Sequence, residues 1–463
     1  MTAEAAEFAV WLRYDDIPKE ALAVGRRCIL DGLGQIAAGS DTEAVRVVAK
    51  DAAEQGGRAD ARLLGSTDAK VPAVLAARVL GTAGHALDWD DTQATKDARH
   101  TYGLLTHPTI PPLAAILSLA QARSPVSGKA FMTAFQAGFE VECKIAEWML
   151  PDAYRRGLHA SAAEGTIGAA VAVARLLELD ERKVRHAIGI AASLSSAGIR
   201  ANVGTETKPL HFGRAAENGL TAALLAERGL GASDAALDGK YGFLGVFGGG
   251  HFPEKPAQGF GRTYSIVDPG VSIKPYPSGI LSHQAMDAML ALVTREELTA
   301  DAVASVEFHA GSNILNPLAY RFARDHLEAK FCIPALLAMI VLRRRGGKQE
   351  FTDAFIASKA MRDMQARIAV HLDQNIEAKG FDKIRSRIEL TTPDGRRFVQ
   401  WADERYRGGP DHPMTDAELE SKVYSATEGV LDRARQDALI AAAWSIDGEQ
   451  TVDSGALAEL LYM

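Results

Sequence analysis

Residues 204–226 read GTETKPLHFGRAAENGLTAALLA, a short polar segment followed by an alanine-rich stretch with helical spacing. Since Lys208 precedes Pro209, we expect this lysine in a turn before the helix, exposed in a pocket, with His211 near the helix start. Unpaired N–H groups at a helix N-terminus, with a lysine and a histidine beside them, suit a ligand that carries carboxylates. The stretch therefore predicts a helical fold and, within it, a site for a small anion.

The preceding sequence has the same texture, because alanine, leucine and glycine dominate it. Small or apolar residues recur at helical spacing in five segments, residues 17–39, 71–88, 110–122, 128–149 and 166–180. Side chains this small let helix axes approach closely. We therefore expect helices packed on helices over residues 1–265.

A second texture begins in the Pro- and Gly-rich residues 251–278. Strand-like alternation appears at 305–310, 367–373, 386–392 and 396–403, with a hairpin through Pro393-Asp394-Gly395. Helices are expected between them, at 281–294, 328–344 and 353–361. From Thr415 onward a capping signal opens a further helical stretch. The predicted fold is mainly α: an all-helical domain of residues 1–265, completed by 405–463, with an inserted smaller α+β domain at 266–404.

Composition limits the possible partners. A net charge of -8 and a pI near 5.9 argue against broad contact with nucleic acids or anionic membranes. No secretion signal or membrane span is expected. The cysteines Cys28, Cys143 and Cys332 are too dispersed for a disulfide framework or a metal cluster. We expect a cytoplasmic protein with a local basic site for anions.

Acidic residues gather at the end of one predicted helix. Asp88, Asp90, Asp91 and Thr92 lead through a polar loop to His107. Carboxylates near a histidine can position a proton donor or acceptor. A solvated acidic loop is the simpler interpretation, and metal ligation a third, although no repeat completes a ligand set.

Other candidate groups stand near predicted helix starts or turns. They are His159, Lys274 and Tyr276 with His283 downstream, and Tyr320, Arg321 and His326. Polar caps and solvated faces would explain each one singly. Their recurrence favours an anion site. A nucleophile elbow, a Walker loop, a dinucleotide fingerprint and an HExxH pair are all missing.

Five motifs follow one another along the chain, and these are HALDWDDT with a following HP, RGLHASAAEGTIGAA, GTETKPLHFGRAAENG, KPYPSG and EAKFCIP. The order of these five motifs resembles the MmgE/PrpD family. Known members include 2-methylcitrate dehydratase, cis-aconitate decarboxylase and iminodisuccinate epimerase. The resemblance covers nearly the whole chain. It implies a helical domain built from both chain ends, an inserted α+β lid, a homodimer, and a site between the domains that needs no metal or other cofactor.

The residues that the resemblance assigns to the site fall in two groups. Those with implied catalytic roles are Asp88, His107, His159, Lys208 and Tyr320, and those with implied substrate-binding roles are Thr92, Lys274, His211 and His283. One departure is the long interval between Thr92 and the HP dipeptide. Its extra residues include Lys96, Arg99, His100 and Tyr102, which we expect to reshape the pocket or to contact a different acid.

Such a site handles a carbanion next to a carboxylate. His107 or His159 would transfer a proton, Lys208 and Lys274 would hold carboxylates and offset enediolate charge, and Tyr320 would donate a proton or bind. Asp88 would orient a histidine or a hydroxyl. The predicted function is a cofactor-independent lyase for a small di- or tricarboxylate, first a 2-methylcitrate dehydratase-like hydro-lyase. Alternatives are cis-aconitate decarboxylation, epimerisation of a dicarboxylate such as iminodisuccinate, and carboxylate binding without catalysis.

Overall fold

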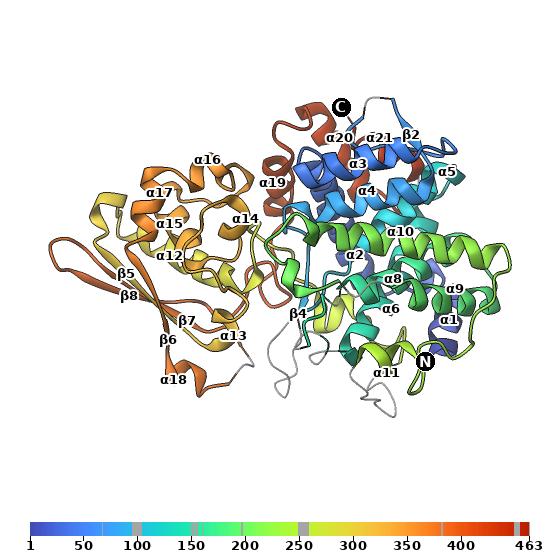
Figure 1. Ribbon diagram of the computed structural model, residues 1–463, viewed down its shortest axis with the longest axis horizontal. Helices are drawn as coiled ribbons and strands as arrows, with labels where there is room; N and C mark the ends of the chain where they lie inside the picture. Colours follow the sequence, from blue (N-terminus) through green and yellow to red (C-terminus); the bar gives the residue numbers. More distant parts are fainter. Residues whose placement is uncertain are drawn as a thin grey trace. The chain divides into compact units, whose positions relative to one another are not determined.

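The chain divides into two compact units, which we call unit 1 and unit 2 (Figure 1). Unit 1 contains residues 1–94, 104–273 and 415–463, and unit 2 is built on residues 274–414. The computed structural model describes residues 1–66, 68–94, 104–149, 153, 156–159, 161–195, 198–248, 259–380, 383–448 and 454–462. The interval with Lys96, Arg99, His100 and Tyr102 lies outside the described residues.

Unit 1 is helical. Its α-helices are α1 (Thr2–Trp11), α2 (Lys19–Gly39), α3 (Glu43–Gln55), α4 (Ala73–Ala86), α5 (Ile110–Arg123), α6 (Gly128–Met149), α8 (Ser161–Leu176), α9 (Glu181–Leu194), α10 (Thr207–Glu227), α11 (Phe243–Phe247), α19 (Asp416–Thr427), α20 (Arg433–Trp444) and α21 (Ser454–Glu459). Its strands form two short antiparallel pairs, β1 (Ala61–Arg62) with β2 (Lys70–Val71) and β3 (Gln93–Ala94) with β4 (Leu104–Thr106). All five helices predicted in the first part of the chain are present.

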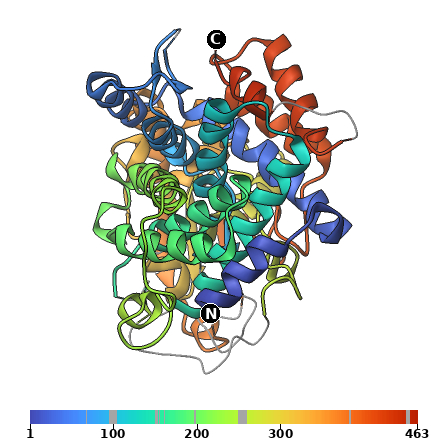
Figure 2. The same cartoon turned by 90° about the vertical axis from the view of Figure 1, so that its right-hand side faces the viewer.

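The end of the chain returns to the helices of its beginning. Helices α19 and α20 pack against α2, and Figure 2 shows the red C-terminal helices beside the blue N-terminal ones. The predicted capping signal is confirmed, since Thr415 and Glu418 form a reciprocal capping box at the start of α19.

Helices α4 and α10 cross with their backbones in contact, and this crossing positions the site. A Cβ atom on Gly81 would lie 2.7 Å from the carbonyl oxygen of Phe212. One on Gly213 would lie 2.4 Å from the carbonyl oxygen of Arg78. Only glycine fits at either place, and the last turn of α4 is thereby brought beside the first turn of α10.

Unit 2 combines a small sheet with helices. Its strands are β5 (Ser305–Ala310), β6 (Ile368–Leu372), β7 (Ser386–Thr391) and β8 (Arg397–Trp401), and its α-helices are α12 (His283–Arg295), α13 (Ser312–Leu315), α14 (His326–Ala329), α15 (Ile333–Arg343), α16 (Asp353–Ile356), α17 (Lys359–Gln365) and α18 (Gln374–Glu377). The strand order is β6-β5-β7-β8, with β5 and β6 parallel and the other pairs antiparallel. Alternate residues of β5 and β7 are buried, and α12 and α15 pack on the sheet.

The chain is thus mainly α with a small sheet, and the four predicted strands and the 386–403 hairpin are confirmed. Two predicted helices are wrong in length. The 328–344 segment is split because Pro334 belongs to the first turn of a new helix, and the 353–361 segment because Ser358 caps another. The turn expected at Lys208 is also wrong: α10 begins at Thr207, and Pro209 is tolerated in its first turn, where N–H groups have no acceptor within the helix.

Among the described residues, no helix combines the length and apolar character needed to cross a bilayer. The three cysteines are buried free thiols.

Candidate active site

A polar cluster is buried inside unit 1, and it begins where α4 ends. His85 occupies the last turn of α4, and Asp88 follows with a left-handed φ of 56°. Aspartate adopts this backbone conformation more readily than most residues. Since the chain reverses there, the acidic segment lies against the helix end, and the Asp88 N–H donates to the carbonyl oxygen of His85.

Both ring nitrogens of His85 have charged partners. Its Nδ1 lies 2.7 Å from Asp90 Oδ1, and its Nε2 lies 2.8 Å from Lys208 Nζ. The imidazole also stacks on the Phe212 ring, with a centroid separation of 3.6 Å. Three independent contacts therefore fix the plane of this ring.

Lys208 joins the helix end to α10. Its Nζ lies 2.9 Å from Asp88 Oδ2, in addition to the contact with His85. The whole residue is only 7% exposed, so the expectation of a solvent-exposed lysine is wrong. The first turn of α10 directs the side chain inward across the α4 crossing, where carboxylate and imidazole replace its water.

His107 is held in one tautomer by the backbone. It follows β4, its N–H donates to Ser161 Oγ, and its Nδ1 lies 2.7 Å from the carbonyl oxygen of Asp91. A carbonyl oxygen only accepts hydrogen bonds, so Nδ1 carries the proton. In the neutral ring the lone pair is then on Nε2, and His107 is suited to act as a base.

His159 and His211 bond to each other through their Nδ1 atoms, which are 2.9 Å apart. Burial lowers the pKa of His159 well below its usual range, and nearby Lys208 lowers it further. Burial and Lys208 also lower the pKa of His211, to about 4. Because both rings are neutral near pH 7, one must donate and the other accept. One member of the pair therefore presents Nε2–H and the other an Nε2 lone pair.

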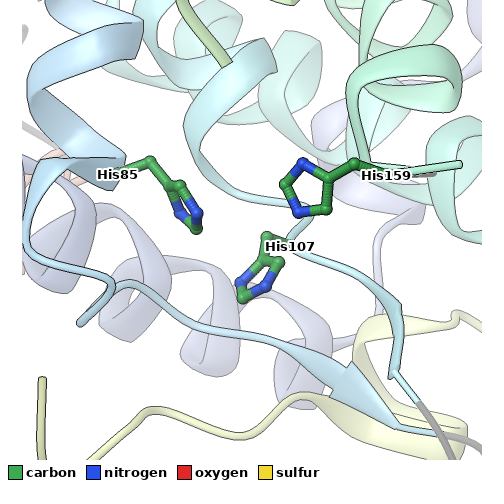
Figure 3. Close-up of side chains that lie close together, drawn as sticks. All are labelled: His85, His107 and His159. Carbon is green, nitrogen blue, oxygen red and sulfur yellow. The ribbon is translucent and has the colours of Figure 1, made fainter. Parts of the chain in front are cut away.

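Three of these imidazoles converge from different parts of the chain (Figure 3). His85 and His107 meet edge to face, with ring centroids 4.9 Å apart. The centroid of His159 lies 6.1 Å from that of His85 and 6.5 Å from that of His107. The helix end, the residue after β4 and the turn before α8 thus contribute one ring each.

Buried carboxyl groups surround the cluster. Asp91 accepts a hydrogen bond from Thr109, and burial, with the charge of Asp90, raises the pKa of Asp91 to about 7. Burial also raises the pKa of Glu164 to about 8, and both its carboxyl oxygens lack a hydrogen-bond partner among the described residues. Unit 1 therefore contains acids that are partly protonated near neutral pH.

Thr92 is satisfied by the protein itself. Its hydroxyl donates to the carbonyl oxygen of Thr106, and its backbone pairs with Ser272. The predicted role of Thr92 in substrate binding stays a prediction.

The remaining predicted site residues belong to unit 2. Lys274 is fully buried, Tyr320 is half-buried and pairs through its backbone with Cys332, and His283 is buried in a polar network. His283 Nδ1 lies 2.7 Å from the Tyr406 hydroxyl, and its Nε2 lies 3.1 Å from the carbonyl oxygen of Ser278. These contacts hold the KPYPSG loop that starts at Lys274. The implied roles of Lys274, Tyr320 and His283 stay predictions.

Two groups within the described residues are close enough to share a metal ion: His85 with His107 and His159, and His85 with Asp88 and Asp90. Both depend on His85. The two ring nitrogens of His85 already bond Asp90 and Lys208. A metal ion at His85 Nε2 would have to displace the ammonium group of Lys208 and would then lie close to that positive charge. This donor set is better suited to proton transfer, and the predicted absence of a metal stays a prediction.

Comparison with known proteins assigns the family. The MmgE/PrpD N-terminal domain matches residues 3–255, and the MmgE/PrpD C-terminal domain matches residues 276–447. The chain belongs to the MmgE/PrpD family. Human cis-aconitate decarboxylase is 26% identical over 93% of this chain and 88% of its own length. The mouse enzyme of that name is 28% identical over 90% and 84%, and that of Aspergillus terreus is 30% identical over 55% and 52%.

In this MmgE/PrpD chain, six of the nine predicted site residues belong to unit 1 and lie in or beside the buried polar cluster. They are Asp88, Thr92, His107, His159, Lys208 and His211. Sequence reasoning missed His85, and it named Asp90 without a role. A histidine three residues before an aspartate at a predicted helix end is a local signal that could have drawn attention to His85.

Proposed function

We propose that this protein is a cofactor-independent lyase that acts on a small di- or tricarboxylic acid through a carbanion stabilised next to a carboxylate. The observation that carries the proposal is the buried contact of Lys208 with Asp88 and His85, beside His107 and His159. An oriented ammonium group stabilises developing negative charge, and neutral imidazoles move protons near pH 7.

Among lyase reactions, decarboxylation of cis-aconitate is our first candidate. The human and mouse relatives with that name match about nine-tenths of this chain, which reverses the order that the motifs alone gave. When the bond between the substrate and a carboxylate breaks, carbon dioxide leaves and the electron pair stays on the substrate. The resulting carbanion must then take up a proton on carbon. The ammonium of Lys208 would offset that charge, and an Nε2–H from the His159–His211 pair would supply the proton.

A second candidate is dehydration of a 2-methylcitrate-type hydroxy acid. It is favoured by the tautomer of His107, because a decarboxylase needs a proton donor whereas a hydro-lyase also needs a base. The Nε2 lone pair of His107 would remove the proton next to a carboxylate, and the hydroxyl would leave with a proton from the histidine pair. We further propose, from the family resemblance, a cytoplasmic homodimer.

The test is incubation of the purified protein with cis-aconitate, 2-methylcitrate, citrate and iminodisuccinate in deuterated water, with products identified by NMR. Decarboxylation of cis-aconitate predicts release of carbon dioxide and one deuterium on carbon in the product. Dehydration of 2-methylcitrate alone would replace the first candidate by the second. Epimerisation, or binding without turnover, would reject the lyase.

Independence from metal is tested on the same reaction. We expect dialysis against a chelator to leave the turnover rate unchanged, because His85 is committed to Asp90 and Lys208. Loss of activity that one divalent ion restores would contradict this.

A further inference from the structure

Four side chains in unit 1 form a continuous polar chain, Asp90–His85–Lys208–Asp88. Its successive contacts measure 2.7, 2.8 and 2.9 Å. All four residues are buried, and His85 and Asp90 are each only 1% exposed. Burial removes competing water, so these contacts decide where hydrogens point.

The chemistry of the end members allows His85 one neutral tautomer. A carboxylate only accepts hydrogen bonds and an ammonium group only donates them. His85 Nδ1 must therefore donate to Asp90, which leaves the Nε2 lone pair to accept from Lys208. Without Asp90 the Nδ1 proton would lose its charged acceptor, and only the contact with Lys208 would still favour this tautomer.

Lys208 is fixed in turn. Its ammonium group bonds His85 Nε2 and forms an ion pair with Asp88 Oδ2, which lies 2.9 Å away. Together these two contacts restrict the position and the orientation of the ammonium group. Stacking on Phe212 holds the His85 ring in the plane that this geometry requires.

We propose that His85 and Asp90 are positioning residues for Lys208: Asp90 selects the tautomer of His85, and His85 orients the ammonium that faces the substrate. The inference rests on the proposed function for the identity of the substrate, but not for the geometry of the chain. Neither residue touches the reacting atoms. They hold Lys208 in its reactive orientation before the substrate binds, so the reaction does not have to supply the free energy of orienting it.

The kinetic test is a double-mutant cycle of His85→Gln and Lys208→Met, with Asp90→Asn as a milder variant that keeps size and shape. Misplacement by about 1 Å can cost about 10²-fold in rate, so we expect His85→Gln to lower kcat by about that factor with a smaller change in KM. In the Lys208→Met background, His85→Gln should cost little more. Equal costs in both backgrounds would overturn the proposal.

Other titratable groups near the chain also influence a pH profile. They include His107, His159, His211 and Asp91, and the ion pair of Asp31 with Lys422, all in unit 1. The matched controls are therefore His186→Gln on α9 and Asp234→Asn in a surface turn, which change the same residue types away from the cluster. We expect Asp90→Asn to change the kcat–pH profile and both controls to leave it as in the unmodified protein.

A second measurement does not depend on turnover. In protein labelled with ¹⁵N-histidine, long-range ¹H–¹⁵N spectra report which nitrogen of each ring carries the proton. We expect His85 to show a protonated Nδ1 and an unprotonated Nε2, and Asp90→Leu, which leaves the Nδ1 proton without its acceptor, to lower the population of this state. A proton on Nε2 of neutral His85 would overturn the proposal even if no substrate is found. If His85→Gln does not fold, Asp90→Asn takes its place in the cycle.

Discussion

Each unit has a buried histidine with hydrogen bonds at both ring nitrogens, but the partners differ. In unit 1, His85 lies between the charged groups of Asp90 and Lys208. In unit 2, His283 lies between the uncharged hydroxyl of Tyr406 and the carbonyl oxygen of Ser278. The unit 2 arrangement holds the KPYPSG loop. In unit 1 the same type of residue is placed to control a cation.

The balance of charge differs as well. In unit 2, Asp287 is matched by Arg407, which donates to both its carboxylate oxygens. In the unit 1 cluster, Asp88 contacts Lys208 and Asp90 contacts His85, while burial leaves His159 and His211 neutral. A matched network resists change. The charge of the partners therefore distinguishes the two buried histidines.

Lys208→Met should break the unit 1 arrangement most severely. We expect a loss of about 10²–10³-fold in kcat, as when one stabilising donor is removed from a reacting site. It should also lower the free energy of unfolding by about 3–5 kcal/mol, because Asp88 would keep a buried charge without its partner. Kinetics and denaturant titration measure the two effects.

Lys208→Met/Asp88→Asn is the companion variant. It should regain much of the lost stability without regaining activity. Wild-type kinetics in Lys208→Met would reject a role for this lysine in the site.

His159→Gln compared with His283→Gln tests the contrast directly. We expect His159→Gln to lower kcat by about 10²–10⁴-fold, the usual contribution of a proton-transfer group. His283→Gln should lower the melting temperature, since it loses contacts to Ser278 and Tyr406, and leave kcat nearly unchanged. A large rise in KM for His283→Gln would instead support its predicted role in substrate binding.

Glu164→Gln tests the excess of buried carboxyl groups in unit 1. Burial raises the pKa of Glu164 to about 8, so from about pH 5 to 7.5 the folded state holds a proton that the unfolded state has lost. Stability should therefore fall as pH rises through this window. Removing one such group should flatten the slope by up to about 1.4 kcal/mol per pH unit.

Urea titrations at several pH values measure this slope. Glu54→Gln, on the exposed face of α3, is the matched control. An unchanged slope in Glu164→Gln would show that this carboxyl group does not hold the proton.

The smallest expected effect is proton uptake on ligand binding. A bound tricarboxylate raises the pKa of nearby histidines, so at pH 7 we expect uptake of up to about one proton per ligand. Calorimetry of a non-reacting tricarboxylate in buffers of different ionisation enthalpy measures it. His159→Gln should reduce the uptake, whereas His283→Gln should leave it unchanged. Ligand binding without proton uptake would show that groups other than these histidines compensate the charge of the ligand.

Much of the fold could be predicted because its signals are local. Period-two alternation located β5–β8, and helical spacing located α2, α4, α5, α6 and α8. The errors came where a helix restarts after a cap, as at Ser358, or carries a proline in its first turn, as at Pro209. Those residues are compatible with a turn and with a helix start, and only tertiary packing decides between the two.

The site was predictable where a motif marked it. Asp88, His107, His159, Lys208 and His211 were named from the sequence and lie together in unit 1. His85 was not, because a single histidine in an apolar helix resembles a core residue. Its partner Lys208 lies 123 positions away, and no local pattern reports a contact over that distance.

The crossing of α4 and α10 limits how such a site can diversify. Since Gly81 and Gly213 bring backbone close to backbone, a larger side chain at either position would push the two helices apart. The distance between His85 and Lys208 is therefore set by the crossing of the two helices. New substrates would have to be accommodated by exchanging residues around this fixed pair, and a selection for altered activity should recover glycine at both positions while its other substitutions gather elsewhere.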